Sequence, residues 1–287
     1  MRPFYRIFLL WVLVLTYVGP AFGQEKSSLL WKVSGNGLEK PSYLFGTIHI
    51  ICKDDFLMDD RIKGAFDQSE KLIMELDMSD PQLQAKMQQV SLNPGMKNIQ
   101  GDLDPESAKA LDVFLTEKYG AGLAQLGILK PFVLSSMVLV KILPCTEMES
   151  YEGFFTTSAT ANNKPIEGLE TVEYQVGIFD QLPQDLQLKE LIKMFNGQES
   201  QAELSKMMSS YLSEDVHALY EVMNESSMMS EYRSLMLDDR NKNWIPKISE
   251  AMKSKSVFVA VGAGHLGGEN GVISLLKQAG YTVEPVK

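Results

Sequence analysis

Tyr43-Leu-Phe-Gly46-Thr-Ile-His49 is an apolar run that reaches a histidine three residues after a glycine, and Val259-Ala-Val-Gly262-Ala-Gly-His265 repeats this arrangement near the other end of the chain. Each run predicts a β-strand, and a glycine lets the backbone turn sharply where the strand ends. The histidine then lies just outside the sheet, where ligands bind in open α/β folds. Because the chain has only three histidines, the pair of turns favours function over the alternative of two buried histidines bonded to backbone.

The segments around these turns predict further strands. Ser27–Lys32 and Ser42–Ile48 are expected to pair as a hairpin across the turn-forming residues Gly35-Asn36-Gly37. The apolar run Lys71–Leu76 and the segment Lys164–Gly168 predict two more short strands. A strand at 256–261, a helix at 270–279 and a strand at 281–286 close the chain, which is the wiring of a mixed or parallel sheet.

The middle of the chain predicts helices. Asp104 and Pro105 form a helix start, and Gly120 ends that helix. Further helices are expected at 58–69, 132–143, 151–161 and 171–181, from Pro183, and in several polar segments out to Met252. We find no repeat and no linker. The predicted fold class is therefore α/β, of mixed α+β character, with a central mixed sheet and a large helical middle region in one domain, residues 24–287.

Three charged residues accompany the histidine turns. Glu75 ends the apolar run Lys71–Leu76, so its buried carboxylate needs a metal ion, a histidine or a basic side chain as partner. Glu170 lies between a strand and a helix, where helix capping is the simpler interpretation. Arg240 lies in a helix, and it could bind a substrate carboxylate, hold Glu75 or Glu170, or simply face solvent.

Residues 195–232 are rich in methionine, serine and glutamate. Methionines in such a segment can line an adaptable groove, but they more often pack a core, and the sequence favours the core. His217 lies in the same segment with no second ligand at helical spacing, so we interpret it as a surface histidine.

The N-terminus predicts export. Arg2 and Arg6 precede the apolar run Phe8–Val18, and Ala21-Phe22-Gly23 provides a cleavage pattern, so residues 1–23 resemble a signal peptide. An uncleaved anchor is the alternative, although the run is short for a membrane span, and no later segment is long and apolar enough for one. The formal net charge of −10 argues against a nucleic-acid partner. In an oxidising compartment Cys52 and Cys145 can form a disulfide, and two buried thiols are the alternative.

Taken together, these places resemble the TraB/PrgY/GumN family, which includes Tiki-type proteases, and in particular its exported GumN-like branch. The matching segments are Pro41–His49, Leu72–Leu76, Tyr151-Glu152, Gly168–Thr171, Arg240-Asn241, Val261–Leu266, Gly271 and Gly280-Tyr281. The resemblance implies a fold related to erythromycin esterases and to a haem-binding lipoprotein class. It also implies metal-dependent peptide hydrolysis through His49, His265 and Glu75, with roles for Glu170 and Arg240.

We therefore expect an exported metal-dependent hydrolase that acts on a peptide or protein. A divalent ion, manganese, cobalt, iron or zinc, would be held by His49, His265 and Glu75, while Glu75, Glu170 and Arg240 would be the catalytic residues. The chain has no His-Glu-x-x-His motif, so the peptidase activity rests on the resemblance. Two alternatives stay open. One is a binder of a peptide, a signal or haem, and the other is a metal-free hydrolase with a histidine as general base.

Overall fold

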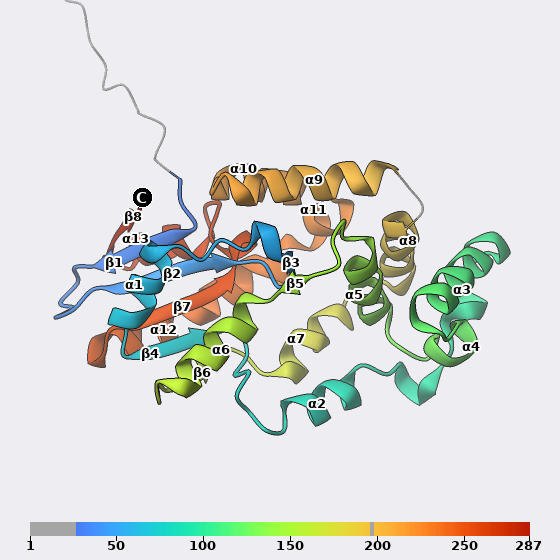
Figure 1. Ribbon diagram of the computed structural model, residues 1–287, viewed down its shortest axis with the longest axis horizontal. Coiled ribbons are helices and arrows are strands. Elements are labelled where there is room, and N and C mark those ends of the chain that lie inside the picture. Colours follow the sequence, from blue (N-terminus) through green and yellow to red (C-terminus); the bar gives the residue numbers. More distant parts are fainter. Residues whose placement is uncertain (1–26, 196–197) are drawn as a thin grey trace, which may run out of the picture.

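A six-stranded mixed sheet forms the centre of the protein (Figure 1). The computed structural model describes residues 27–195 and 198–287. The strand order is β6 (Ile166–Gly168), β4 (Lys71–Met74), β7 (Val257–Gly262), β2 (Ser42–Thr47), β1 (Leu30–Ser34) and β8 (Thr282–Pro285). β6, β4, β7 and β2 are parallel, whereas β1 is antiparallel to both β2 and β8. The predicted mixed sheet is confirmed.

The predicted hairpin is β1 and β2, with Leu30 opposite Phe45. Gly35, Asn36 and Gly37 all have positive φ in the connecting turn, which explains why small, turn-forming residues occupy it. β2 is buried along its whole length and β7 along nearly all of it, so both carry continuous apolar runs instead of an alternating pattern.

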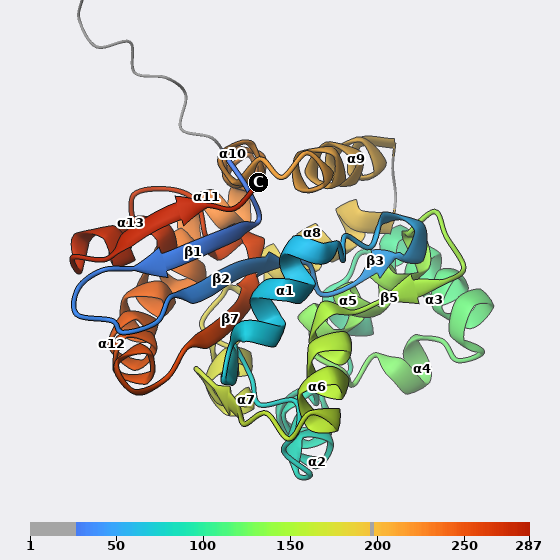
Figure 2. The ribbon, with the colours of Figure 1, turned by 60° about the vertical axis from the view of Figure 1, so that its left-hand side comes forward.

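Helices cover both faces of the sheet (Figures 1 and 2). On one face, α1 (Asp60–Gln68) and α6 (Tyr151–Ala161) place Phe66 and Phe155 against Phe258 of β7. On the other face lie α12 (Asp239–Ser254) and α13 (Val272–Gln278). The large buried cluster between these layers is the main core.

A second group of helices lies beyond the carboxyl ends of the parallel strands (Figure 1). It has its own buried cluster, which includes Leu111, Leu134 and Leu191. The helices are α2 (Leu83–Val90), α3 (Pro105–Tyr119), α4 (Leu123–Leu126), α5 (Pro131–Ile142), α7 (Val172–Phe179) and α8 (Gln184–Phe195). The expected α3 start is confirmed: Asp104 accepts hydrogen bonds from the N–H groups of Glu106 and Ser107.

A run of helices then connects this group back to the sheet. It consists of α9 (Gln198–Leu212), α10 (Val216–Asn224), α11 (Ser227–Arg233) and a π-helical turn, Ser234–Asp238, which leads directly into α12. Among the described residues, 27–195 and 198–287, no helix is both long and apolar enough to cross a membrane. The predicted signal peptide lies outside the described residues.

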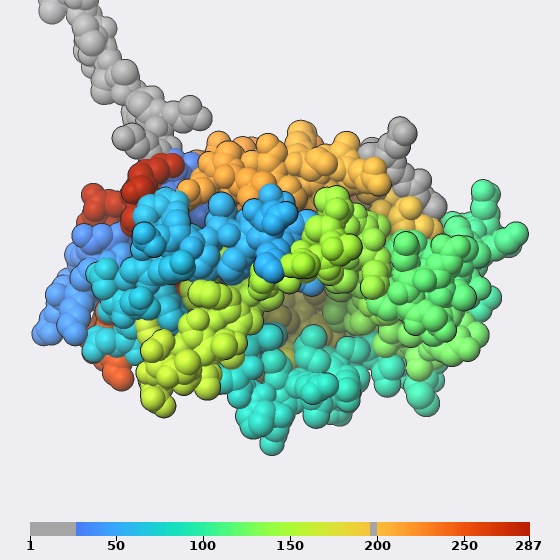
Figure 3. Space-filling model, viewed as in Figure 1, coloured from blue at the N-terminus to red at the C-terminus, as the bar shows by residue number. Residues whose placement is uncertain are grey.

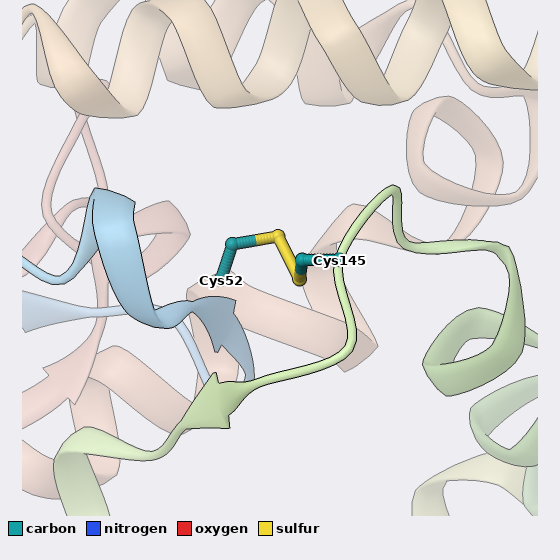
Figure 4. The surroundings of a disulfide bond; sticks show 2 residues. All are labelled: Cys52 and Cys145. Carbon is teal, nitrogen blue, oxygen red and sulfur yellow. A yellow bond between two sulfur atoms is a disulfide. The ribbon is translucent and has the colours of Figure 1, made fainter.

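Cys52 and Cys145 form a disulfide with a Cα–Cα distance of 5.8 Å (Figure 4). It lies beside a two-stranded ribbon of β3 (Ile51–Cys52) and β5 (Met148–Glu149), which the sequence did not predict because two-residue strands have no detectable periodicity. The disulfide prediction is confirmed, and the alternative of two buried thiols is wrong.

We expect the Cys52→Ser/Cys145→Ser double variant to be less stable than the wild type by about 2–5 kcal/mol, since the bond closes a loop between residues 93 positions apart. Urea denaturation of both proteins measures the difference, with reductant added to the wild type as a second route to the open form. Equal midpoints for the oxidised wild type and the double variant would contradict the expectation.

Candidate functional site

The two histidine turns lie side by side because β2 and β7 are parallel neighbours. Gly46 pairs with Val261 and Thr47 with Gly262, so both strands end at the same edge. β4 flanks β7 on its other side, with Met74 opposite Ala260, and Glu75 follows directly. The sheet thus brings together segments more than two hundred residues apart in sequence, as adjacent strands are only about 4.8 Å apart.

These strand ends open into a cavity of about 280 Å³. Its lining includes four of the five predicted site residues: His49, Glu75, Arg240 and His265. Glu170 does not line the cavity but bonds to Arg240 behind it. The third histidine of the sequence, His217, is exposed on α10, as the sequence predicted, and does not line this cavity.

The motif glycines serve close packing, so the predicted reason for them, a sharp turn, is wrong. Neither Gly46 nor Gly262 has positive φ. A Cβ at Gly46 would lie 2.8 Å from Leu266 and 2.9 Å from Ala263, so this glycine lets the second turn pack onto β2. A Cβ at Gly262 would lie 3.3 Å from the Glu75 Oε1 atom, so this glycine leaves space for the carboxylate.

His265 is buried, and its neighbours fix its tautomer. The Asn241 amide donates to the carbonyls of His265 and Asn270, so its Oδ1 faces the ring and accepts from His265 Nδ1 at 2.6 Å. His265 Nε2 then carries a lone pair, to which Arg240 Nη1 donates at 3.1 Å. Burial, together with the positive charge of Arg240, lowers the pKa of His265 to about 3. The ring is therefore neutral at pH 7.

Glu75 is a buried carboxylate with a full set of donors. Its Oε1 accepts from the Gly262 N–H at 2.9 Å, and its Oε2 accepts from Gln175 Nε2 at 2.9 Å and Arg240 Nη2 at 2.6 Å. Burial alone would raise the pKa of Glu75, but the positive charge of Arg240 and the hydrogen bond from the Gly262 N–H hold that pKa low, at about 2. Glu75 is thus ionised, with Oε1 3.9 Å from His265 Nε2.

Arg240 connects the site to a second buried carboxylate, Glu170. Its Nε and Nη2 atoms donate to Glu170, and Nη1 also donates to the Met236 carbonyl, so all of its guanidinium nitrogens have acceptors. Trp244 Nε1 donates to Glu170 as well, at 2.9 Å. The interpretation of Arg240 as a solvated helix residue is wrong, because its side chain is only 11% exposed.

The capping role predicted for Glu170 is also wrong. The residue that caps α7 is Thr171, whose side chain accepts from the Tyr174 N–H. The Glu170 carboxylate is instead the bidentate partner of Arg240, and its side chain is 3% exposed. The sequence put both residues near the site but could not show that they bond to each other.

His49 differs from His265 in both environment and charge. Its side chain is 75% exposed, and Nδ1 lies 3.2 Å from Glu152 Oε1. The hydrogen bond to the Glu152 carboxylate raises the pKa of His49. Thr47 and Ser150 donate to Glu152 and hold its carboxylate in place. His49 is therefore the cationic histidine of the pair.

Comparisons with known proteins establish the relationship of the chain. The sequence model of the TraB/PrgY/gumN family matches residues 29–285. The chain belongs to this family. It is 24% identical over 92% of its length to metalloprotease TIKI2 of Danio rerio and of Xenopus tropicalis, and 23% identical over 91% to metalloprotease TIKI1 of Danio rerio.

This TraB/PrgY/gumN member covers only part of those relatives. It spans 62%, 61% and 63% of their lengths, respectively. No solved structure shows significant similarity to it. The family resemblance inferred from the motifs is thus confirmed.

The predicted metal ligands Glu75, His265 and His49 have the atom types that bind a divalent ion. The structure does not bring all three together around one point. Glu75 and His265 are deprotonated, as metal ligands must be, and Glu75 and Glu170 share the single positive charge of Arg240. Glu75 Oε1 and His265 Nε2 lie 3.9 Å apart, wider than the roughly 3.3 Å between two ligands that are each about 2 Å from a tetrahedral ion, so the two side chains would have to close slightly on an ion. However, His49 bonds to Glu152, and the described part of the chain contains no group of three residues placed to hold an ion.

Sequence reasoning missed three residues that orient the site: Glu152, Asn241 and Gln175. Glu152 and Asn241 lie in segments that carry the family resemblance, Tyr151-Glu152 and Arg240-Asn241, so a signal existed for both. Gln175 gave none, since a glutamine on a short helix has no distinguishing context.

We expect Glu170→Gln to lower the free energy of unfolding by about 3 kcal/mol, because it replaces one of the carboxylate oxygens that accept from the buried Arg240 with an NH2 group, which cannot accept. Urea denaturation measures this change. Glu167→Gln is the matched control: Glu167 pairs with Lys71 while half exposed, so its loss should cost under about 1 kcal/mol. Equal losses in the two variants would show that the Arg240–Glu170 pair adds nothing specific.

We expect Glu152→Gln to lower the pKa of His49, since the carboxylate stabilises the imidazolium. Because the pKa of His49 is raised in the folded protein, the His49–Glu152 pair contributes its full stabilisation at pH values below 6.5, the ordinary pKa of histidine. This contribution is lost as the pH rises through the higher pKa of His49. NMR titration of the histidine ring signals in both proteins checks this. An unchanged His49 titration would show that Glu152 does not control it.

Proposed function

We propose that this protein is an exported metal-dependent hydrolase that cleaves peptide bonds. The observation that carries the proposal is the pair of Glu75 and His265, which are ionised and neutral, respectively, at pH 7 and lie 3.9 Å apart at the end of two adjacent parallel strands. Membership of the TraB/PrgY/gumN family and the names of the metalloprotease relatives support it.

His265, Glu75 and His49 would hold the divalent ion, which when bound supplies an activated water and polarises the scissile carbonyl. Asn241 keeps the His265 lone pair directed into the site, and Gln175 together with the Gly262 N–H fixes the Glu75 carboxylate. Arg240 Nη1 donates to the same lone pair, so metal binding at Nε2 requires this hydrogen bond to break.

The remaining charged groups have separate parts in the proposal. His49 is exposed at the cavity and cationic, and its Nδ1 atom is engaged with Glu152, so Nε2 must lose its proton before it can bind the ion. Glu170 holds the Arg240 guanidinium, and Arg240 neutralises Glu75 until an ion binds. Export rests on the charged and apolar N-terminal pattern, which would place the cavity in a periplasmic or extracellular setting.

A second candidate is metal-free hydrolysis. The hydrogen bond from Arg240 to His265 favours it, because this contact occupies the nitrogen that a metal would need. Against it, neither His265 nor Glu75 has a pKa suited to a general base at pH 7. The third candidate is a non-enzymatic binder of a peptide, a signal or haem in the same cavity.

Metal analysis and peptide hydrolysis together test the proposal. Protein freed of metal by chelation and then supplied with Mn²⁺, Co²⁺, Fe²⁺ or Zn²⁺ should bind one ion per chain and cleave a peptide library only when loaded. His265→Ala and Glu75→Ala should each lower both properties by at least about 100-fold, and Asn241→Ala by about 10–100-fold, as for a residue that orients a ligand. His217→Ala, on the exposed part of α10, should change neither.

The alternatives give different results in the same experiment. Cleavage that survives chelation, without stoichiometric metal, would support the metal-free hydrolase. Tight peptide binding or haem absorbance without cleavage would support the binder. Either result would overturn the metal-dependent proposal.

A further inference from the structure

Four methionines of the segment 195–232 and its continuation form one wall of the cavity at the proposed catalytic site. They are Met207 of α9, Met223 of α10, Met229 of α11 and Met236 of the π-helical turn. All four side chains are half-buried, not sealed in the core. Met207 and Met223 also pack against the main core, as the sequence favoured for this segment, and they line the cavity as well.

The remainder of this wall is apolar as well. Leu219 and Leu237 line it, and so does Tyr211, whose hydroxyl donates to the Gly46 carbonyl at 3.2 Å and is therefore engaged. Apart from Arg240 and Tyr211, the charged and titratable lining residues come from the strand ends: His49, Glu75 and His265. The cavity is thus lined both by the proposed catalytic groups and by apolar side chains, among which methionines predominate.

The methionine wall touches the catalytic turn itself. A Cβ at Gly264 would lie 2.5 Å from the Met223 Cε atom and 2.6 Å from its Sδ atom. Only a glycine at this position, next to His265, lets the Met223 side chain approach so closely. A substrate side chain in contact with Met223 would therefore lie beside Gly264, the residue that precedes His265. The methionines and the proposed catalytic groups thus belong to one site.

The helices that carry the wall lie along one edge of the molecule and connect the sheet to the second helical group (Figures 1 and 3). Each methionine comes from a different helical element of this run. Since methionine side chains are unbranched and flexible, a wall built from four of them adapts to apolar groups of different shapes. A wall of branched residues would select one shape.

We propose that the methionine wall is the specificity pocket of this hydrolase and receives one large apolar side chain of a peptide substrate, adjacent to the bond that is cleaved. This inference rests on the proposed function. The volume of about 280 Å³ is slightly below the range of about 300–1,000 Å³ for drug-sized ligands, so it suits one side chain with its flanking backbone. Leucine, methionine and phenylalanine fit this wall, whereas aspartate and lysine would be buried there without a partner.

The first test is a peptide library with one variable position next to the cleaved bond. We expect kcat/KM to be at least about 100-fold higher for leucine, methionine or phenylalanine than for aspartate or lysine, which follows from burying a charge in an apolar pocket. Met229→Lys should lower cleavage of the leucine peptide and raise that of the aspartate peptide relative to it. The matched control is Met228→Lys, the neighbour on α11, which lines a different cavity. Equal effects of both variants would overturn the proposal.

The second test does not depend on hydrolysis. Protein labelled with ¹³C at the methionine methyls is titrated with N-acetyl-leucinamide. A separate titration uses the α-amide of N-acetyl-aspartic acid, whose side-chain carboxylate is charged. Leucinamide should shift the signals of Met207, Met223, Met229 and Met236 but not that of the exposed Met96. No shift at the four methionines, or equal shifts with both compounds, would overturn the pocket. Shifts without any peptide cleavage would instead show that the pocket exists and that the proposed hydrolase function is wrong.

Discussion

The buried guanidinium of Arg240 is the interaction on which the site depends. It joins α12 to Glu75 after β4, to Glu170 before α7 and to His265 after β7, so one side chain connects four segments of the fold. Two buried carboxylates without this cation would repel each other in a region of low dielectric. The positions of β4, β7 and the turn before α7 are therefore coupled through charge as well as through the sheet.

The same network gives the two motif histidines different properties. His265 is buried against Trp244 and receives a hydrogen bond from a cation, so it stays neutral with its lone pair in the cavity. His49 lies at the exposed side against Glu152, so it carries a charge. Two copies of one short motif, placed on adjacent strands, thus supply one neutral imidazole, whose Nε2 atom carries a lone pair, and one imidazolium cation.

The cavity needs both parts of the fold. The sheet supplies the polar groups at its strand ends, and the helical run from α9 to the π-helical turn supplies the apolar wall. The Cys52–Cys145 disulfide joins the segment that follows His49 to the segment that precedes Glu152. This covalent link holds the two chain segments together near the His49–Glu152 contact. The continuation of the π-helical turn into α12 likewise joins Met236 and Arg240, and the Met236 carbonyl accepts from that arginine.

The sequence by itself determined the six strands of the main sheet, most of the helices and the two histidine turns, because apolar periodicity, caps and turn residues are local signals. It also identified Glu75, Glu170 and Arg240 as residues near the turns, and the family to which they belong. Only the tertiary structure decided which residues contact one another. Arg240 pairs with Glu170, His49 pairs with Glu152, and Gly46 makes room for the turn that follows β7. Those contacts join residues far apart in sequence, and their partners are chosen by burial and charge in three dimensions, which no local pattern records.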